Sequence, residues 1–174
     1  MMKIILVGYM GSGKSTIGKE LSKNVGIPFY DLDEIIQKSE KETIKKIFET
    51  KGEVYFRKIE SFIFKNFISK TDGFILALGG GTPCYANNHE IFYQEDICSF
   101  YLKGSIETLT SRLIKEKENR PLIANLTENE LEEYIRKHIF DRSYYYLQSK
   151  QVISIDNKSI EITVEEIEQK IKLA

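Results

Sequence analysis

The sequence predicts an α/β domain in which a central, mostly parallel five-stranded sheet is flanked by helices. Five short apolar runs indicate strands, and helix-compatible stretches separate most of them. Short buried strands that alternate with helices are typical of βαβ units and therefore of a parallel sheet. The five runs are Ile4–Val7, Pro28–Tyr30, Phe74–Leu78, Ile97–Leu102 and Val152–Ile155.

Length and charge exclude several classes of protein. The chain has 174 residues, which fits one domain, and 41% of them are hydrophobic, which is enough to build a core. The formal net charge is −1, with positive and negative residues interspersed. We therefore expect no nucleic-acid partner and no membrane partner, and any anion must bind at a local site.

The cysteines and the amino-terminal residues favour a cytoplasmic location. Cys84 and Cys98 lack the spacing of metal ligands, and we interpret both as reduced thiols. Cys84 fits a small buried residue better than a nucleophile. The first apolar run, Ile4–Val7, is too short for a signal peptide or a membrane span.

A phosphate-binding motif follows the first predicted strand. Residues 8–15, Gly-Tyr-Met-Gly-Ser-Gly-Lys-Ser, match G-x-x-x-x-G-K-[ST] in full, and a plausible helix follows. Glycines allow backbone N–H groups to surround phosphates, and the helix N-terminus adds partial positive charge. Lys14 can reach the β- and γ-phosphates, and the Ser15 hydroxyl can ligate Mg²⁺. The nucleotide-binding residues expected here are Gly11, Ser12, Gly13, Lys14, Ser15 and Thr16.

The carboxylate that assists metal binding must come from outside the strand Phe74–Leu78. The strand Phe74–Leu78 ends in three glycines and carries no carboxylate, although many proteins with this motif have one there. Asp31 and Asp33, just past the second strand, are the obvious suppliers. Capping of the helix that begins near Glu34 is the alternative role, since aspartate is a favoured N-cap.

Helical periodicity predicts two helices that face the core. Two other segments are predicted as additions to the alternating strands and helices. The first helix has the stripe Phe56, Ile59, Ile63 and Phe67, and the second has Ile160, Val164, Ile167 and Ile171. The long, mostly helical interval 31–72 and the polar segment Lys115–Leu126 both lie where a parallel sheet binds ligands, beyond the carboxyl ends of its strands.

Together, the motifs resemble the ordered motif set of the shikimate kinase family, and their spacing fits from residue 3 to about residue 158. The set comprises Gly8–Ser15, Asp31-x-Asp33, Phe56–Glu60, Gly79–Gly81 and Arg120–Leu122. The resemblance implies a single P-loop kinase domain over residues 1–174, with a helical substrate-binding insertion at 31–60 and a lid at 115–126. It further implies phosphoryl transfer from ATP, with Mg²⁺, to the 3-hydroxyl of shikimate, a step of aromatic amino acid biosynthesis. We also expect a monomer.

The resemblance assigns roles residue by residue. Lys14, Asp33 and Arg120 would be catalytic, with Asp33 as base and Arg120 on the mobile lid. Ser15 and Asp31 would hold Mg²⁺. Two further sets follow. Besides the phosphate loop, Arg112 and Arg120 would bind ATP, together with the region 156–158 at the adenine. The acceptor would be bound by Asp33, Arg57, Glu60, Gly79, Gly80, Gly81 and Arg142.

Each of these short motifs has a simpler reading. Arg57 and Glu60 are three residues apart on one predicted helix, as in an ordinary surface ion pair. The three glycines and Arg120-Pro121 could be plain turns. The family has Arg-x-Pro-Leu-Tyr where this chain has Arg142-Ser-Tyr-Tyr-Tyr146, so the proline is missing while the arginine and the final tyrosine remain. His89 and His138 have no partner spacing and receive no role.

Other functions are compatible with the same fold. A gluconate- or nucleoside-monophosphate-type kinase is the first alternative, and the triple glycine with Phe-Arg-x-x-Glu favours shikimate over both. A GTP-dependent switch is the second. Asp156-Asn157-Lys158 resembles part of a guanine-reading motif, but residue 160 is isoleucine where an acidic reader is required. An inactive relative is disfavoured because Lys14 and Asp33 are both present.

Overall fold

The computed structural model describes residues 2–117 and 122–172. Its five strands form a single sheet in the order β2-β3-β1-β4-β5, and every neighbouring pair is parallel. The predicted sheet and its five strands are therefore confirmed. The strands are β1 (Lys3–Val7), β2 (Phe29–Asp31), β3 (Phe74–Ala77), β4 (Ile97–Lys103) and β5 (Gln151–Ser154).

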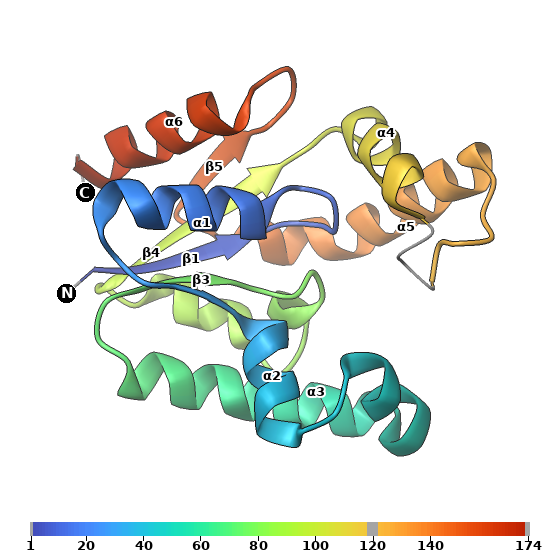
Figure 1. The fold of residues 1–174 in the computed structure, drawn as a ribbon, viewed down its shortest axis with the longest axis horizontal. Coiled ribbons are helices and arrows are strands. Elements are labelled where there is room, and N and C mark those ends of the chain that lie inside the picture. Colours follow the sequence, from blue (N-terminus) through green and yellow to red (C-terminus); the bar gives the residue numbers. More distant parts are fainter. Residues whose placement is uncertain (1, 118–121, 173–174) are drawn as a thin grey trace.

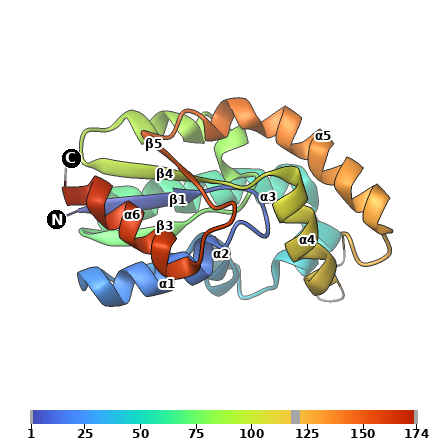
Figure 2. The same ribbon diagram turned by 90° about the horizontal axis from the view of Figure 1, so that it is seen from above.

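Helices cover both faces of the sheet (Figures 1 and 2). Alternate side chains of β1 point to opposite faces, so that Ile4 and Leu6 enter one apolar cluster while Ile5 and Val7 enter the other. Helices α1 and α6 cover the first face, and α2, α3 and α5 the second. The helices are α1 (Lys14–Val25), α2 (Leu32–Glu40), α3 (Ile44–Lys70), α4 (Ile106–Glu116), α5 (Glu128–Tyr146) and α6 (Ile160–Lys172), with 3₁₀ turns η1 (Thr82–Cys84) and η2 (Asn88–Tyr93).

The helical stripes pack as predicted with one exception. In α3, Phe56 and Ile63 are buried, and Val164 and Ile167 are buried in α6. Ile160, which begins the stripe of α6, is instead 39% exposed and lines a cleft, so its prediction as a core residue was wrong. The first turn of α6 lies at the carboxyl edge of the sheet, where apolar side chains border a ligand cleft instead of the core.

Two segments were predicted as additions at the ligand-binding edge of the sheet. The predicted insertion at 31–60 contains α2 and the first part of α3, which is kinked at Gly52 (φ 80°). The predicted lid at 115–126 is described only in part, and there Ile123 is fully buried in the apolar cluster that contains Ile5. The segment therefore has an apolar anchor that its polar composition did not predict.

A search for membrane-spanning helices covered the described residues. No helix within them is long and apolar enough to cross a bilayer.

Candidate active site

The phosphate loop joins β1 to α1 at the carboxyl edge of the sheet. Gly11 and Gly13 adopt left-handed backbone with φ of 78° and 85°, which other residues rarely adopt. Helix α1 starts at Lys14 without a side-chain cap, so that its first N–H groups are available to an anion. The Lys14 ammonium group donates to the carbonyls of Gly8 (2.7 Å) and Tyr9 (3.0 Å), and thus lies folded over the loop.

Asp31 caps helix α2 and also contacts the phosphate loop. Its Oδ1 accepts a hydrogen bond from the Asp33 N–H (3.0 Å), so that Asp31 caps helix α2. Its Oδ2 accepts from the Ser15 hydroxyl at 2.8 Å. Two oxygen donors beside the phosphate loop fit Mg²⁺, a hard cation that binds oxygen and usually keeps several waters. Within residues 2–117 and 122–172, no cluster of three or more histidine, cysteine or acidic side chains could hold a metal by itself.

Asp33 has the electrostatic character of a base. The pKa of its carboxyl group is raised to about 6, chiefly by burial and also by the nearby carboxylates of Asp31 and Glu60, while Lys14 and Arg57 act in the opposite direction. A carboxylate with this pKa is ionised at neutral pH, yet its proton affinity is far above that of an ordinary aspartate.

The glycine run holds the acceptor side of the site together. A Cβ atom added at Gly81 would lie 2.8 Å from both Nη atoms of Arg57. One at Gly79 would lie 3.2 Å from Asp33 Oδ1 and 3.3 Å from Glu60 Oε1, and one at Gly80 would lie 3.6 Å from Arg142 Nη1. The absence of side chains at all three positions lets charged groups from three other elements approach the backbone, which a plain turn would not require.

Arg57 and Glu60 form a buried pair. Arg57 Nη1 donates to Glu60 Oε2 at 2.9 Å, and Glu60 is only 1% exposed, which excludes a solvated surface pair. Burial lowers the pKa of Arg57, but Glu60 and its other neighbours raise it more, so the guanidinium stays charged. A buried carboxylate needs further donors, and one is the Thr82 hydroxyl, which donates to Glu60 Oε1 at 2.7 Å.

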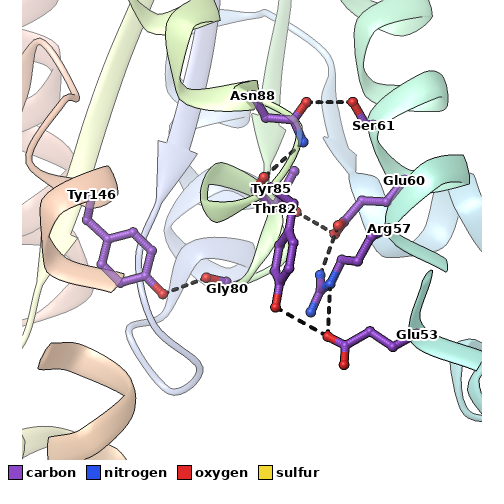
Figure 3. Close-up of polar contacts among 9 residues, drawn as sticks. All are labelled: Glu53, Arg57, Glu60, Ser61, Gly80, Thr82, Tyr85, Asn88 and Tyr146. Atoms are coloured by element: carbon purple, nitrogen blue, oxygen red, sulfur yellow. Dashed lines mark hydrogen bonds and ion pairs between the residues drawn. The ribbon is translucent and has the colours of Figure 1, made fainter. Parts of the chain in front are cut away.

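The hydrogen bonds continue behind Glu60 through residues to which the sequence assigned no role (Figure 3). The Asn88 amide donates to the Thr82 carbonyl (2.9 Å), and the Ser61 hydroxyl donates to Asn88 Oδ1 (2.8 Å). All three residues are buried. This relay fixes Thr82, and Thr82 in turn fixes the Glu60 carboxylate.

Helix α5 contributes Arg142 to the same place. The helix runs unbroken through Arg142 to Tyr146, and Tyr144 stands in it where the family has proline. Arg142 and Tyr146 are four residues apart and so share one face. The Tyr146 hydroxyl donates to the Gly80 carbonyl at 2.6 Å, which ties α5 to the glycine run.

Two further residues missed from the sequence join the phosphate loop to α5. The Tyr9 hydroxyl lies 2.9 Å from Nδ1 of His138, and the Arg142 guanidinium lies 5.8 Å from the centre of the Tyr9 ring. Burial and the charge of Arg142 lower the pKa of His138, which favours the neutral imidazole. Tyr9 and His138 are 129 residues apart, and no local pattern could have paired them.

Cys84, three residues after the glycine run, is an unreactive thiol. It is half-buried and free, and burial raises its pKa to about 11. It is therefore protonated at neutral pH and a poor nucleophile. Cys98 is free as well.

One cleft of about 450 Å³ connects the phosphate loop to the acidic pair, the glycine run and the start of α6. Arg112 lines it and donates to the Gly11 carbonyl at 3.3 Å. Among the predicted site residues, Ser12 is buried beneath the loop, while Arg57, Glu60, Gly81 and Arg142 adjoin the cleft without lining it. Arg120 lies outside the described residues. The predicted residues that line the cleft are Gly11, Gly13, Lys14, Ser15, Thr16, Asp31, Asp33, Gly79, Gly80 and Arg112.

The region expected at the adenine is only partly represented in the cleft. Lys158 lines it, whereas Asp156 accepts a hydrogen bond from the Ser105 N–H (2.9 Å) and holds the turn before α6. Asn157 occupies the left-handed region at φ 55°.

The parallel sheet, the phosphate loop at its carboxyl edge and the polar pocket beside it define a P-loop phosphotransferase. Comparison with known proteins gives the family, since the family model described as shikimate kinase matches residues 10–172. A shikimate kinase of Flavobacterium psychrophilum is 54% identical over 96% of this chain and 97% of its own. That of Flavobacterium johnsoniae is 52% identical over the same shares. The chain belongs to the shikimate kinase family.

Solved structures agree with this assignment. A shikimate kinase from Bacteroides thetaiotaomicron superposes with a TM-score of 0.90 at 27% identity, covering 98% of both chains. A shikimate kinase from Acinetobacter baumannii in complex with shikimate gives a TM-score of 0.85 at 31% identity, covering 98% of this chain and 93% of that one.

Proposed function

We propose that this chain transfers the γ-phosphoryl group of ATP to the 3-hydroxyl of shikimate, giving shikimate 3-phosphate and ADP in the biosynthesis of aromatic amino acids. The observation that carries the proposal is the meeting of three groups at the Gly79–Gly81 run. These groups are a basic aspartate, Asp33, and two arginines, Arg57 and Arg142. Shikimate offers the matching chemistry, a ring with one carboxylate and three hydroxyls.

The acceptor is held by its two kinds of polar group. Arg57 and Arg142 bind the carboxylate, because a planar guanidinium forms paired hydrogen bonds with it. Glu60 orients Arg57 through the 2.9 Å ion pair. Asp33 accepts the proton of the attacking hydroxyl, which aligns the acceptor oxygen with the phosphoryl group.

The chemical step is the transfer of the γ-phosphoryl group to the acceptor oxygen. The acceptor oxygen forms a bond to the γ-phosphorus, the bond from that phosphorus to the β,γ-bridging oxygen breaks, and ADP leaves. Lys14 and the N–H groups of the phosphate loop stabilise the charge on the phosphate oxygens, so most of the rate comes from positioning and electrostatics. Arg120, by family resemblance, supplies a further positive charge there.

Magnesium belongs to the nucleotide side of the site. Ser15 and Asp31 would hold Mg²⁺, Asp31 through water, and the ion would neutralise charge on the phosphates. Arg112 lies at the same end of the cleft and contacts the nucleotide. We further propose a cytoplasmic monomer, with residues 31–60 as the substrate-binding insertion and 115–126 as the lid.

A coupled ADP-release assay with Mg²⁺-ATP tests the proposal. Shikimate, gluconate and nucleoside monophosphates are offered in parallel, with ATP alone as the blank. We expect ADP release above the blank with shikimate only, and a single phosphorylated product by mass spectrometry. Faster ADP release with gluconate or a nucleoside monophosphate would show that the chain is a kinase for that acceptor instead.

A further inference from the structure

The guanidinium of Arg57 is held by more than Glu60 (Figure 3). Its Nε donates to Glu53 Oε1 at 3.4 Å, on the edge away from the Glu60 contact. The ring of Tyr85 lies over the guanidinium, with its centre 4.2 Å from Cζ. The Tyr85 hydroxyl donates to the same Glu53 oxygen at 3.3 Å. Tyr85, Glu53 and Arg57 thus form a closed set of contacts, which we call the arginine clamp.

Tyr85 is well placed to act on Arg57 and poorly placed to stabilise the core. It ends the η1 turn, four residues after Gly81, and its carbonyl accepts a hydrogen bond from the Asn88 N–H (3.0 Å). Its side chain remains 37% exposed. A tyrosine this exposed contributes little apolar burial, so that its principal contact is the one with the guanidinium.

The arginine clamp restricts a rotation of the Arg57 guanidinium that the ion pair with Glu60 alone would allow. A single ion pair through Nη1 still allows the guanidinium to rotate about its bonds, and a carboxylate ligand accepts paired hydrogen bonds only from a fork in the correct plane. An aromatic ring over the face defines that plane, and Glu53 holds the Nε edge within it. The remaining N–H groups of Arg57 are then presented in one fixed direction.

We propose that Tyr85 is a positioning residue that fixes the plane of the Arg57 guanidinium, and so favours acceptors that carry a carboxylate. The proposal rests on the proposed function, since it assumes that Arg57 binds the shikimate carboxylate. Tyr85 acts through Arg57 and takes no part in the chemical step.

Three variants separate this role from a general structural one. Tyr85→Leu removes the ring, Tyr85→Phe keeps the ring and removes only the hydroxyl, and Tyr93→Leu is the matched control. Tyr93 is 57% exposed on the neighbouring η2 turn and contacts Gln148, with no contact to Arg57. Tyr85→Ser replaces the leucine variant if that variant does not fold by circular dichroism.

Steady-state kinetics supplies the readout, with shikimate and with the same cyclohexene triol lacking the carboxylate. We expect Tyr85→Leu to raise KM for shikimate about 5–10-fold, the range for losing one partly desolvated cation–π contact. KM for ATP, kcat and KM for the triol should stay within about twofold of wild type. Tyr85→Phe and Tyr93→Leu should also remain within about twofold for shikimate.

Each contrary outcome is informative. An equal loss with shikimate and the triol would make Tyr85 a wall of the acceptor pocket. An unchanged KM for shikimate would mean that the ion pairs with Glu60 and Glu53 orient Arg57 without the ring. Either result overturns the positioning role while the kinase assignment stands. A wild-type enzyme that does not phosphorylate shikimate would overturn the proposed function and this inference with it.

Discussion

The two halves of the candidate site are built by different means. The phosphate half comes from eight consecutive residues, and its ligand-binding groups are mainly backbone N–H groups made available by Gly11 and Gly13. The acceptor half is assembled from side chains on α2, α3 and α5 that meet at the backbone of the glycine run. It depends on buried hydrogen bonds such as that from Thr82 to Glu60. We propose that the first half binds the phosphates of the nucleotide and that the second selects the acceptor. A mutation should therefore damage one half and leave ligand binding by the other intact.

The largest expected effect is on the phosphate half. Lys14→Ala should lower turnover by roughly 10³-fold or more, because it removes a positive charge that acts on the transferring phosphates. KM for shikimate should change little. The measurement is kcat with both substrates saturating, and circular dichroism checks that loss of the contacts to Gly8 and Tyr9 leaves the fold intact. Near-normal turnover in a folded protein would contradict the role of the loop.

The next effect belongs to the acceptor half. Asp33→Asn should lower kcat by about 10²–10⁴-fold, the usual cost of losing a positioned base. Nucleotide affinity should be unchanged. In wild type, activity should rise with pH through about 6 and then level, since burial raises the pKa of Asp33 to about 6 and the base must be ionised. A variant with normal kcat and weakened nucleotide binding would mean that Asp33 is a metal ligand and not the base.

A smaller effect on shikimate binding is expected at Gly81, where the backbone meets the Arg57 guanidinium. Gly81→Ala places a methyl group 2.8 Å from Arg57 Nη1 and Nη2, so the guanidinium must shift. KM for shikimate should rise about tenfold, the cost of a misdirected carboxylate contact. KM for ATP serves as the internal control. A parallel rise in both constants would show that the two halves are not independent.

A further effect is on stability, and it has the opposite sign to the effect on activity. The folded pKa of Asp33 is about 6, above the unfolded value of 3.8, so its contribution to stability is fully present below pH 3.8. That contribution is lost as the pH rises through about 6, because the unfolded chain releases the proton more readily. Asp33→Asn should therefore raise the free energy of unfolding near neutral pH by on the order of 1–2 kcal/mol.

Urea unfolding of wild type and Asp33→Asn at acidic and neutral pH measures this difference. The two proteins should converge as the pH falls toward 4. A variant that is less stable than wild type near neutral pH would mean that the Asp33 carboxylate is held by net attraction, not strained by burial.

The contrast between the two halves also explains what could be predicted from the sequence. The strands were predictable because buried parallel strands are short continuous apolar runs, and the phosphate loop because its residues are contiguous. Ile160 was mispredicted because helical periodicity cannot tell a core face from a cleft wall. The Tyr9–His138 contact joins residues far apart in the chain, and the fold alone brings them together.

The acceptor half was accessible only through family resemblance. Arg57 and Glu60 as a pair in the sequence resemble any surface ion pair, and only the 1% exposure of Glu60 distinguishes them. The relay through Asn88 and Ser61 crosses 27 residues and has no local signature. Tyr85 likewise gains its role from the position of the Arg57 guanidinium, which is a property of packing.

The most direct test of the division between the two halves is calorimetric titration of Arg57→Lys with shikimate, with the triol that lacks the carboxylate, and with Mg²⁺-ADP. Lysine keeps the charge but loses the planar fork. We expect shikimate to bind about tenfold or more weakly, while the triol and Mg²⁺-ADP bind as they do to wild type. Equal weakening of shikimate and the triol, or a loss of Mg²⁺-ADP affinity, would contradict this division.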